Sequence, residues 1–375
     1  MIKRTLTETI TKKSVEGKAI IVFGPRQVGR STLLNLIKES VTEKSVFLDC
    51  DSLEIKKMLE GSNVNNLKRI ITKDSTVFID EAQRVKNIGL TLKIIIDQIK
   101  PKKLYVSGSS AFNLSNEINE PLTGRKLEYH LFPFSLKELV DHYGFLEESQ
   151  NIEYRMIFGM YPDIINNPGN ETELLKNLTD SYLFKDIFTF QDMRKPEMLQ
   201  DLLEALAHHI GSEVSFNELA QITGSNPHTV QKYIGMLERA FVVFRLRSFN
   251  RNARNEIKKG IKIYFYDNGV RNAIIGNYNQ LSKRTDVGAL WENFVVSERM
   301  KYLSYNKKYA KRYFWRTTQQ QEIDYIEELN GQLSAFEIKW HTMRKVKFPK
   351  TFTNKYPDAD LNIINPENIW DFVGV

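Results

Sequence analysis

Cysteine is nearly absent from this chain of 375 residues, which contains only one, Cys50. A single cysteine allows no intrachain disulfide and no cysteine cluster for zinc. The chain also lacks any run of about 18 apolar residues, which excludes a helix that spans a membrane. Its first residues lack the apolar core of a secretory signal, so we expect a cytoplasmic protein with no membrane partner.

Acidic residues are fewer than basic ones by seven, and the basic excess is concentrated in three segments. Residues 226–262 hold nine Lys or Arg and two Glu, residues 299–316 hold seven basic residues and no acid, and residues 341–355 hold five and no acid. Such segments are typical of nucleic-acid contacts and equally of solvated surfaces, so both interpretations stay open. The length predicts two or three domains.

The most informative segment that is present is the loop Gly-Pro-Arg-Gln-Val-Gly-Arg-Ser-Thr at residues 24–32. An apolar run at 19–23 precedes it and an amphipathic run at 33–37 follows, so we predict a strand, a loop and a helix in that order. Backbone N–H groups and a helix N-terminus then bind phosphate groups. The predicted nucleotide-binding residues are Gly24, Pro25, Arg26, Gln27, Val28, Gly29, Arg30, Ser31 and Thr32.

Arg30 departs from the usual pattern of such loops, which place a lysine at that position. Arginine keeps the positive charge and binds phosphate through two N–H groups, but it is larger and planar. A displacement of a catalytic group by about 1 Å costs on the order of 100-fold in rate. Arg30 is therefore more readily compatible with nucleotide binding than with hydrolysis. The alternative to an ATPase is therefore a nucleotide-dependent switch or partner-binding module without hydrolysis.

A second predicted strand, at 76–79, leads into Asp80 and Glu81. Ligands of α/β proteins bind at the carboxyl ends of parallel strands. There Asp80 would orient Mg²⁺ through water, Ser31 would be the direct hydroxyl ligand, and Glu81 would polarise the attacking water. The alternative is a strand followed by an acidic helix start. With the upstream loop, the pair predicts ATP and Mg²⁺ as ligands.

Short apolar runs at 45–49 and 103–107 extend the same pattern. About five parallel strands with intervening helices make a doubly wound α/β domain, which we expect to form a P-loop ATPase core over residues 1–145. Ser109 follows the run at 103–107, where it either contacts the γ-phosphate or the water, or caps a helix.

The motifs GPRQVG-ST, VFIDEAQ, YVSGSSA, LTGR and LFPFSLKEL, in this order, resemble the AAA+-type ATPases of archaea and bacteria that carry the uncharacterised domain DUF4143. The resemblance covers nearly the whole chain. It implies a sensor role for Ser109 and stabilisation of the γ-phosphate charge by Arg125, within one chain or across an interface in a homo-oligomer. The alternative for Arg125 is a surface salt bridge. Residues 146–196 are expected to form a helical lid or linker.

Residues 197–250 have the pattern of a winged helix-turn-helix. The pattern predicts a first helix, a second helix, a glycine turn, a third helix and a strand that alternates at 241–246. Ser215 and Glu218 form a predicted capping box. A DNA-binding role would place the third helix in the major groove and the wing on phosphates. The alternative is a winged helix that only packs domains or subunits. The candidate DNA contacts are His228, Thr229, Gln231 and Lys232 on the helix and Arg245, Arg247, Arg251 and Arg254 on the wing.

The segment 251–375 contains an amphipathic helix carrying Glu292 and a predicted hairpin with Asn330-Gly331 at its turn. Glu337 and Lys339 are two apart and share one face of the sheet, and Asp324 comes from the partner strand. Two acids beside a lysine suit magnesium-assisted phosphodiester cleavage.

This arrangement resembles the PD-(D/E)xK nucleases, which implies an α/β nuclease-like fold. In that resemblance Glu292 is the helix acid, Asp324 and Glu337 are metal ligands, and Lys339 is the catalytic lysine. The alternative is a hairpin with a solvated Asp–Lys pair. An ATP-regulated DNA nuclease is therefore one further function to test.

Overall fold

The computed structural model describes residues 1–12, 15–61, 63–109, 118–183, 196–250, 260–341 and 346–375. It divides into two compact units, Met1–Phe132 with residues 239–241, and Pro133–Glu238 with Val242–Val375. We call them the first and the second unit and describe each separately. Every helix among the described residues is too short or too polar to cross a lipid bilayer.

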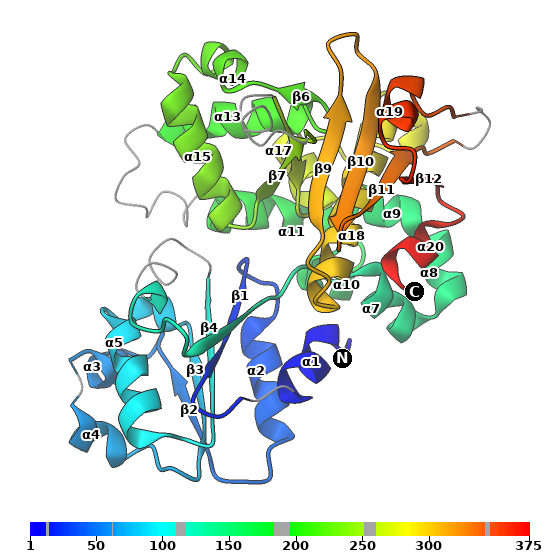
Figure 1. Ribbon diagram of the computed structural model, residues 1–375. Helices are drawn as coiled ribbons and strands as arrows, with labels where there is room; N and C mark the ends of the chain where they lie inside the picture. Colours follow the sequence, from blue (N-terminus) through cyan, green and yellow to red (C-terminus); the bar gives the residue numbers. More distant parts are fainter. Residues whose placement is uncertain (13–14, 62, 110–117, 184–195, 251–259, 342–345) are drawn as a thin grey trace. The chain divides into compact units, whose positions relative to one another are not determined.

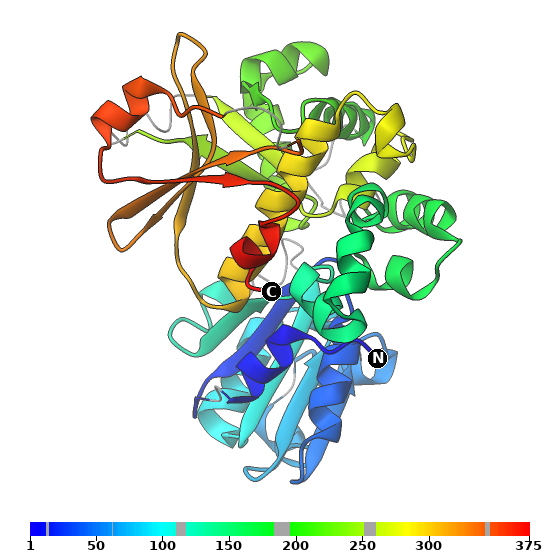
Figure 2. The same cartoon turned by 90° about the vertical axis from the view of Figure 1, so that its right-hand side faces the viewer.

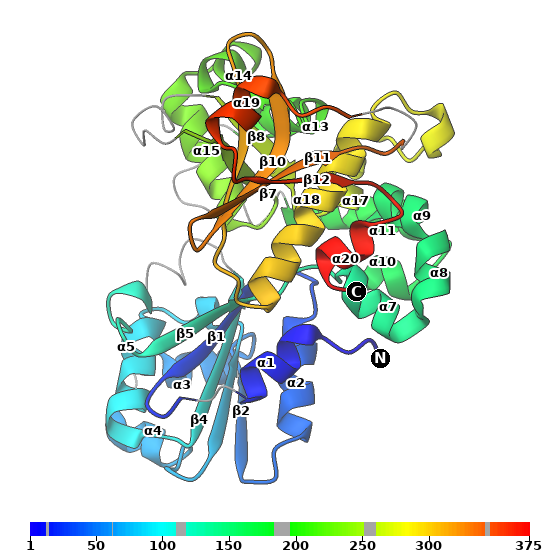
Figure 3. The ribbon, with the colours of Figure 1, turned by 45° about the vertical axis from the view of Figure 1, so that its right-hand side comes forward.

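The first unit is built on a five-stranded sheet with the order β2-β3-β4-β1-β5, in which all neighbours are parallel. The helix α2 lies on one face and α5 on the other (Figures 1 and 3). This confirms the expected doubly wound α/β architecture of the first unit. Its strands are β1 (Ala19–Gly24), β2 (Ser45–Asp49), β3 (Thr76–Asp80), β4 (Lys103–Ser109) and β5 (Lys126–His130). Its helices are α1 (Thr5–Lys12), α2 (Arg30–Glu39), α3 (Leu53–Leu59), α4 (Val64–Lys68), η1 (Ala82–Arg84), α5 (Ile88–Ile94) and η2 (Ile95–Ile99).

The central strands of this sheet are mostly apolar because helices cover both faces. All six residues of β1 and all five of β3 are buried. Aromatic side chains also stack from strand to strand, with ring centroids 6.1 Å apart between Phe47 and Phe78 and 5.1 Å apart between Phe78 and Tyr105. These rings fix neighbouring strands in register, which brings the carboxyl ends of β1, β3 and β4 to one edge.

The second unit contains a seven-stranded mixed sheet with the order β12-β11-β10-β9-β7-β8-β6. The pairs β11–β12 and β7–β9 are parallel, and the other pairs are antiparallel. The strands are β6 (Glu213–Val214), β7 (Val243–Ser248), β8 (Ile261–Phe265), β9 (Lys311–Arg316), β10 (Glu322–Leu329), β11 (Gln332–Ile338) and β12 (Asp360–Ile364). The fold is therefore an all-parallel α/β unit followed by a mixed α/β unit.

The helices of the second unit include those of the expected winged helix. The hairpin turn at 330–331 and the capping box of Ser215 and Glu218 are both present. The helices are α7 (Leu136–Tyr143), α8 (Phe145–Gln150), α9 (Ile152–Phe158), α10 (Pro162–Asn166), α11 (Glu171–Asn177), η3 (Leu178–Leu183), α13 (Pro196–His208), α14 (Phe216–Ile222), α15 (Pro227–Arg239), α17 (Asn268–Ile274), η4 (Leu281–Lys283), α18 (Val287–Tyr305), α19 (Lys350–Lys355) and α20 (Ile369–Val373).

The sheet of the second unit joins the expected winged-helix segment, 197–250, to the C-terminal segment, 251–375. Strands β6, β8 and β7 form the small sheet that accompanies α13, α14 and α15, and the parallel pairing of β7 with β9 continues it into the C-terminal strands. Residues on both sides of position 250 thus share one continuous sheet.

Helix α18 lies against this sheet and contacts β8 and β11 (Figure 2). The sequence predicts an amphipathic helix here, but α18 is buried on nearly all sides, including Trp291, Glu292 and Glu298. A helix enclosed all round must pair its charged side chains inside the protein. That requirement brings Glu292 into the ionic cluster described below.

Candidate functional site

The loop at 24–32 joins β1 to α2 in a conformation that opens its backbone toward a ligand. Gln27 and Gly29 both have left-handed backbone angles, with φ values of 58° and 91°. Gly29 is the N-cap of α2, and no side chain caps the helix there. The first turn of α2 contains no acidic residue, and Ser31 and Thr32 are exposed on it. A helix N-terminus of this kind attracts anions.

Gly24 is required for a steric reason. A Cβ at this position would collide with the carbonyl oxygen of Leu131, whose N–H donates to Phe23 at 2.7 Å. The segment that follows β5 therefore passes directly over the start of the loop, and only glycine leaves room for it.

Arg30 is buried, and its guanidinium turns back onto the loop. It donates to the carbonyl oxygens of Gly24 and, at 2.7 Å, Pro25, and it forms an ion pair of 2.7 Å with Glu81. Its Nε is buried without a hydrogen-bond partner among the described residues. Arg30 thus joins the phosphate-binding loop to the acidic pair across the sheet edge.

Glu81 has a left-handed backbone with a φ of 50°, which directs its carboxylate toward the loop. Burial opposes its ionisation, but the charge and hydrogen bond of Arg30 outweigh this and lower the pKa of Glu81. Gln83 donates to the other carboxylate oxygen and accepts at 3.2 Å from the N–H of Ser109. The carboxylate is therefore held ionised and oriented.

Asp80 ends β3 and is buried beside β4. The hydroxyl of Ser107 and, at 3.0 Å, the N–H of Glu81 donate to its Oδ1. Asp80 supplies a buried carboxylate at the end of β3 and Ser31 an exposed hydroxyl on the first turn of α2, and oxygen donors of these kinds suit Mg²⁺. Asp80 and Ser31 are therefore the residues of this chain that would hold the ion, which would orient and neutralise the phosphates of a nucleotide.

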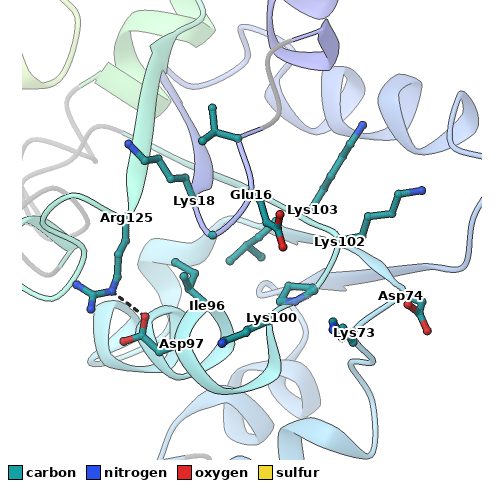
Figure 4. Close-up of a pocket in the computed structure, with 14 residues that line it drawn as sticks. Glu16, Lys18, Lys73, Asp74, Ile96, Asp97, Lys100, Lys102, Lys103 and Arg125 are labelled. Carbon is teal, nitrogen blue, oxygen red and sulfur yellow. Dashed lines mark hydrogen bonds and ion pairs between the residues drawn. The ribbon is translucent and has the colours of Figure 1, made fainter.

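Ser109 lies at the same edge of the sheet, paired in register with Gly24. Arg125 does not. It directly precedes β5, and its carbonyl oxygen accepts from the N–H of Ala19 at the amino end of β1. Its guanidinium pairs with Asp97 at 2.7 Å in a cavity at that opposite edge (Figure 4). A strand of six residues is about 20 Å long, so Arg125 does not reach the loop of its own chain. The within-chain role predicted for it is wrong, and only a role across an interface remains as a prediction.

Several contacts of the loop and its acidic pair involve residues that the sequence analysis did not select. Arg4 is buried and donates to the carbonyl oxygens of Val28, at 3.0 Å, and Phe132. Ser107 and Gln83 orient Asp80 and Glu81. Gln83 and Ser107 lie in the motifs VFIDEAQ and YVSGSSA, which could have indicated them. Arg4 is far from any motif, so only the tertiary structure reveals it.

In the second unit, α15 presents a polar outer face, with His228, Gln231 and Lys232 exposed and Thr229 half-buried. Arg247 is exposed on β7. Arg245 instead forms a bidentate ion pair with Glu238, and its Nε lies 2.7 Å from a carboxylate oxygen. Its predicted phosphate contact is therefore corrected to an internal pair. Arg251 and Arg254 lie outside the described residues.

The second unit also brings Glu292, Asp324, Glu337 and Lys339 into one cluster, in which the three carboxylates are buried and Lys339 is half-buried. The ammonium group of Lys339 lies 2.7 Å from both Asp324 and Glu337. Lys262, fully buried on β8, pairs with Glu292 at 2.9 Å and with Glu322 at 2.5 Å. The hydroxyl of Tyr264 donates to Glu292 at 2.6 Å. The sequence analysis missed Lys262 and Tyr264, because β8 lies far from the hairpin in sequence, and it also missed Glu322, the first residue of the hairpin strand β10.

Burial controls the titration of this cluster. Burial, together with the charge of Asp324, raises the pKa of Glu337 to about 7 although Lys339 opposes the shift. Burial also raises the pKa of Glu292, against the charge of Lys262. Among the described residues, no three His, Cys, Asp or Glu side chains are placed to hold a metal ion. In this geometry, the carboxylates form ion pairs with Lys262 and Lys339.

Three known domain families match successive parts of the chain. The AAA domain family matches residues 16–140, and two domains of unknown function, DUF8612 and DUF4143, match residues 149–281 and 287–368. The chain thus carries matches to an AAA domain and to a DUF4143 domain, and it is similar to proteins that join the two. The AAA domain, with its P-loop, implies a nucleotide ligand.

Related proteins are similar to this chain over most of its length. An uncharacterized protein of Mycobacterium tuberculosis is 25% identical over 326 residues, which cover 85% of this chain and 70% of that protein. One of Haemophilus influenzae is 25% identical over 351 residues, covering 86% and 83%. A solved Walker-type ATPase of Pyrococcus abyssi is 14% identical, with a TM-score of 0.50 over 73% of this chain and 96% of that one. At this identity, the likeness is one of fold.

The domain matches divide the buried cluster. Glu292, Asp324, Glu337 and Lys339 belong to the DUF4143 match, whereas Lys262 and Tyr264 belong to the DUF8612 match. The two domains of unknown function therefore complete one ionic cluster jointly, while the AAA domain holds the whole loop site.

Proposed function

We propose that the AAA domain binds ATP with Mg²⁺ at the 24–32 loop and hydrolyses it. The observation that carries this proposal is the chain of contacts from Arg30 through Glu81 and Gln83 to Ser109. It joins the loop, the acid that would polarise water and the candidate sensor at one sheet edge. Glu81 is ionised and oriented, as a residue that accepts a proton from water must be.

Arg30 gives this site a control step. A phosphate that binds in the loop competes with Glu81 for the guanidinium, since both are anions that arginine binds through paired N–H groups. When Arg30 moves to the phosphates, Glu81 is released to act on water. Hydrolysis then requires that the phosphate replace Glu81 as the partner of Arg30. If this replacement is slow, the protein stays in its ATP-bound state and acts as a nucleotide-dependent switch.

The test compares phosphate release and ATP binding in wild-type protein, Arg30→Lys and Glu81→Gln, with Glu54→Gln on the exposed start of α3 as the matched control. We expect Glu81→Gln to bind ATP and release no phosphate, and Arg30→Lys to change the rate of release. Absence of ATP binding by calorimetry in folded wild-type protein with Mg²⁺ contradicts the proposal. Binding without release in wild-type protein selects the switch.

A second candidate function concerns DNA and rests on the buried cluster. We infer that the second unit contacts DNA through the outer face of α15 and cleaves it with Glu292, Asp324, Glu337 and Lys339. The support is that four residues chosen by their pattern meet in space with a carboxyl of raised pKa. Mg²⁺ would require Lys339 to leave Asp324 and Glu337, whose oxygens are suitable ligands.

The test for this second function is cleavage of supercoiled plasmid with Mg²⁺ or Mn²⁺. We expect nicking that is lost in Lys339→Met and retained in Lys350→Met, a change at an exposed lysine of the same unit. Intact plasmid with every metal tried, together with retained DNA binding, leaves the cluster with a structural role only.

A further inference from the structure

A cavity of about 890 Å³ opens at the amino edge of the AAA sheet, away from the loop site (Figure 4). Four segments form it, at 15–18, 73–74, 96–104 and residue 125, and they lie at the starts of β1, β3, β4 and β5. Among the described residues that line it, six are basic and three are acidic. The basic residues are Lys18, Lys73, Lys100, Lys102, Lys103 and Arg125.

This positive charge is only partly balanced, because Glu16, Asp74 and Asp97 of the lining and the nearby Glu43 offset part of it and leave an excess of basic residues. Arg125 pairs with Asp97, and Lys102 pairs at 3.1 Å with Glu43. The side chains of Lys18, Lys73, Lys100 and Lys103 have no ion pair among the described residues. The C-terminus of η2, which ends beside Lys100, carries only about half a negative charge, so it offsets a small part of the excess.

The lining also determines what kind of anion fits. Among the residues that the structure describes, no aromatic side chain lines the cavity, so they offer no surface on which a base would stack. Lysine ammonium groups act as point charges and suit phosphate groups. A volume of this size accommodates a ligand with several groups rather than a single ion.

From these observations, we infer that the cavity is a second anion site, which binds closely spaced phosphate groups. Free oligophosphate and the backbone of a nucleic acid both carry this chemistry. The site is independent of the ATP site proposed above, because it lies at the opposite edge of the sheet.

The experiment is lysine acetylation footprinting of the full-length protein, read by mass spectrometry. It separates the two sites because the 24–32 loop contains no lysine. One arm uses tripolyphosphate and the other a short duplex DNA. At a ligand concentration about ten times Kd, we expect acetylation of Lys18, Lys100 and Lys103 to fall about fivefold or more. The exposed lysines Lys57, Lys68 and Lys93 of the same unit serve as matched controls and should not change.

The two arms identify the ligand. Protection by tripolyphosphate alone assigns a free oligophosphate, protection by DNA alone assigns a nucleic-acid backbone, and protection by both supports the shared chemistry. Equal protection of cavity and control lysines, or no protection in either arm, overturns the inference. As a second measurement, Lys18→Gln/Lys100→Gln should weaken binding of the protecting ligand about tenfold by calorimetry, whereas Lys57→Gln/Lys68→Gln should not.

Discussion

The loop site of the AAA domain and the ionic cluster of the second unit both hold a candidate catalytic carboxylate against a basic side chain. They differ in how the chain brings the partners together. In the AAA domain, Arg30 and Glu81 follow two strands of one parallel sheet, so the topology alone delivers them to one edge. In the second unit, Lys262 and Glu292 come from a strand and a helix of two matched domains. The first pair belongs to a site open to ligand, and the second is part of the core.

This difference predicts that the second pair matters most for stability. Lys262→Met should lower the free energy of unfolding by about 3 kcal/mol or more, because Glu292 and Glu322 lose their buried counter-charge. Urea unfolding measures the effect, with Lys350→Met as control. A loss below about 1 kcal/mol, within the range of an exposed pair, would mean that the cluster is not part of the core.

The loop pair should matter for turnover rather than for stability. If the AAA domain hydrolyses ATP as proposed, Asp80→Asn should lower kcat about a hundredfold or more, as removal of one group that stabilises the transition state does. Glu54→Gln, far from the site, should leave kcat unchanged. The measurement is phosphate release at saturating ATP, and comparable rates in wild type and Asp80→Asn would remove Asp80 from the mechanism.

The two sites should also differ in pH response. Glu337 holds its proton in the folded protein up to about pH 7, whereas the unfolded chain releases it near 4.5. Between these values the folded state binds more protons, so the Glu337 carboxyl lowers the free energy of unfolding as pH rises. The charge of Asp324 raises this pKa and that of Lys339 lowers it. Glu337→Gln should therefore gain stability relative to wild type between about pH 5 and about pH 7.5.

In the AAA domain Glu81 behaves in the opposite way, because its pKa is lowered. Its contribution is present above its unfolded pKa and is lost as pH falls through the folded value. Glu81→Gln should therefore lose stability relative to wild type at neutral pH, and the loss should shrink in acid. Urea unfolding of both variants across pH tests this, and parallel profiles would contradict the contrast.

The smallest effect is expected at Arg4, which supports the loop without facing a ligand directly. Arg4→Met leaves the carbonyl oxygens of Val28 and Phe132 without this donor and should weaken ATP binding about fivefold. Lys3→Met, at an exposed neighbouring position, is the matched control. Calorimetry with ATP and Mg²⁺ measures the difference. Equal affinity in both variants would show that the loop holds its shape without Arg4.

Much of the AAA domain could be predicted because its signals are local. The apolar runs at 19–23 and 76–79 predict buried parallel strands, and these strands occur as β1 and β3. Strand order then places Asp80, Glu81 and Ser109 beside the loop. The error at Arg125 has a physical cause, since residues before and after a strand lie at opposite edges of the sheet. A motif read without the strand boundary at 126 does not distinguish them.

The basic segments show what a local reading of charge misses. Lys262 and Arg299 come from segments with few or no acids, yet each pairs with a carboxylate from elsewhere along the chain. Arg245 pairs with a glutamate of its own segment, and Lys301 with one from the preceding turn of α18. The positive excess that lines a cavity instead comes from the AAA domain, whose segments looked balanced. Local charge in a sequence is therefore a poor guide to surface charge, because folding pairs residues that are distant along the chain.

By itself, the sequence determined the phosphate-binding loop, the acidic pair, the parallel sheet and the hairpin, because spacing and apolar periodicity act over a few residues. Only the tertiary structure decided the partners of Arg30, the place of Arg125, the burial of α18 and the part of Lys262 in the C-terminal cluster. Each of these depends on which distant groups share a low-dielectric interior, where an unpaired charge is too costly to remain.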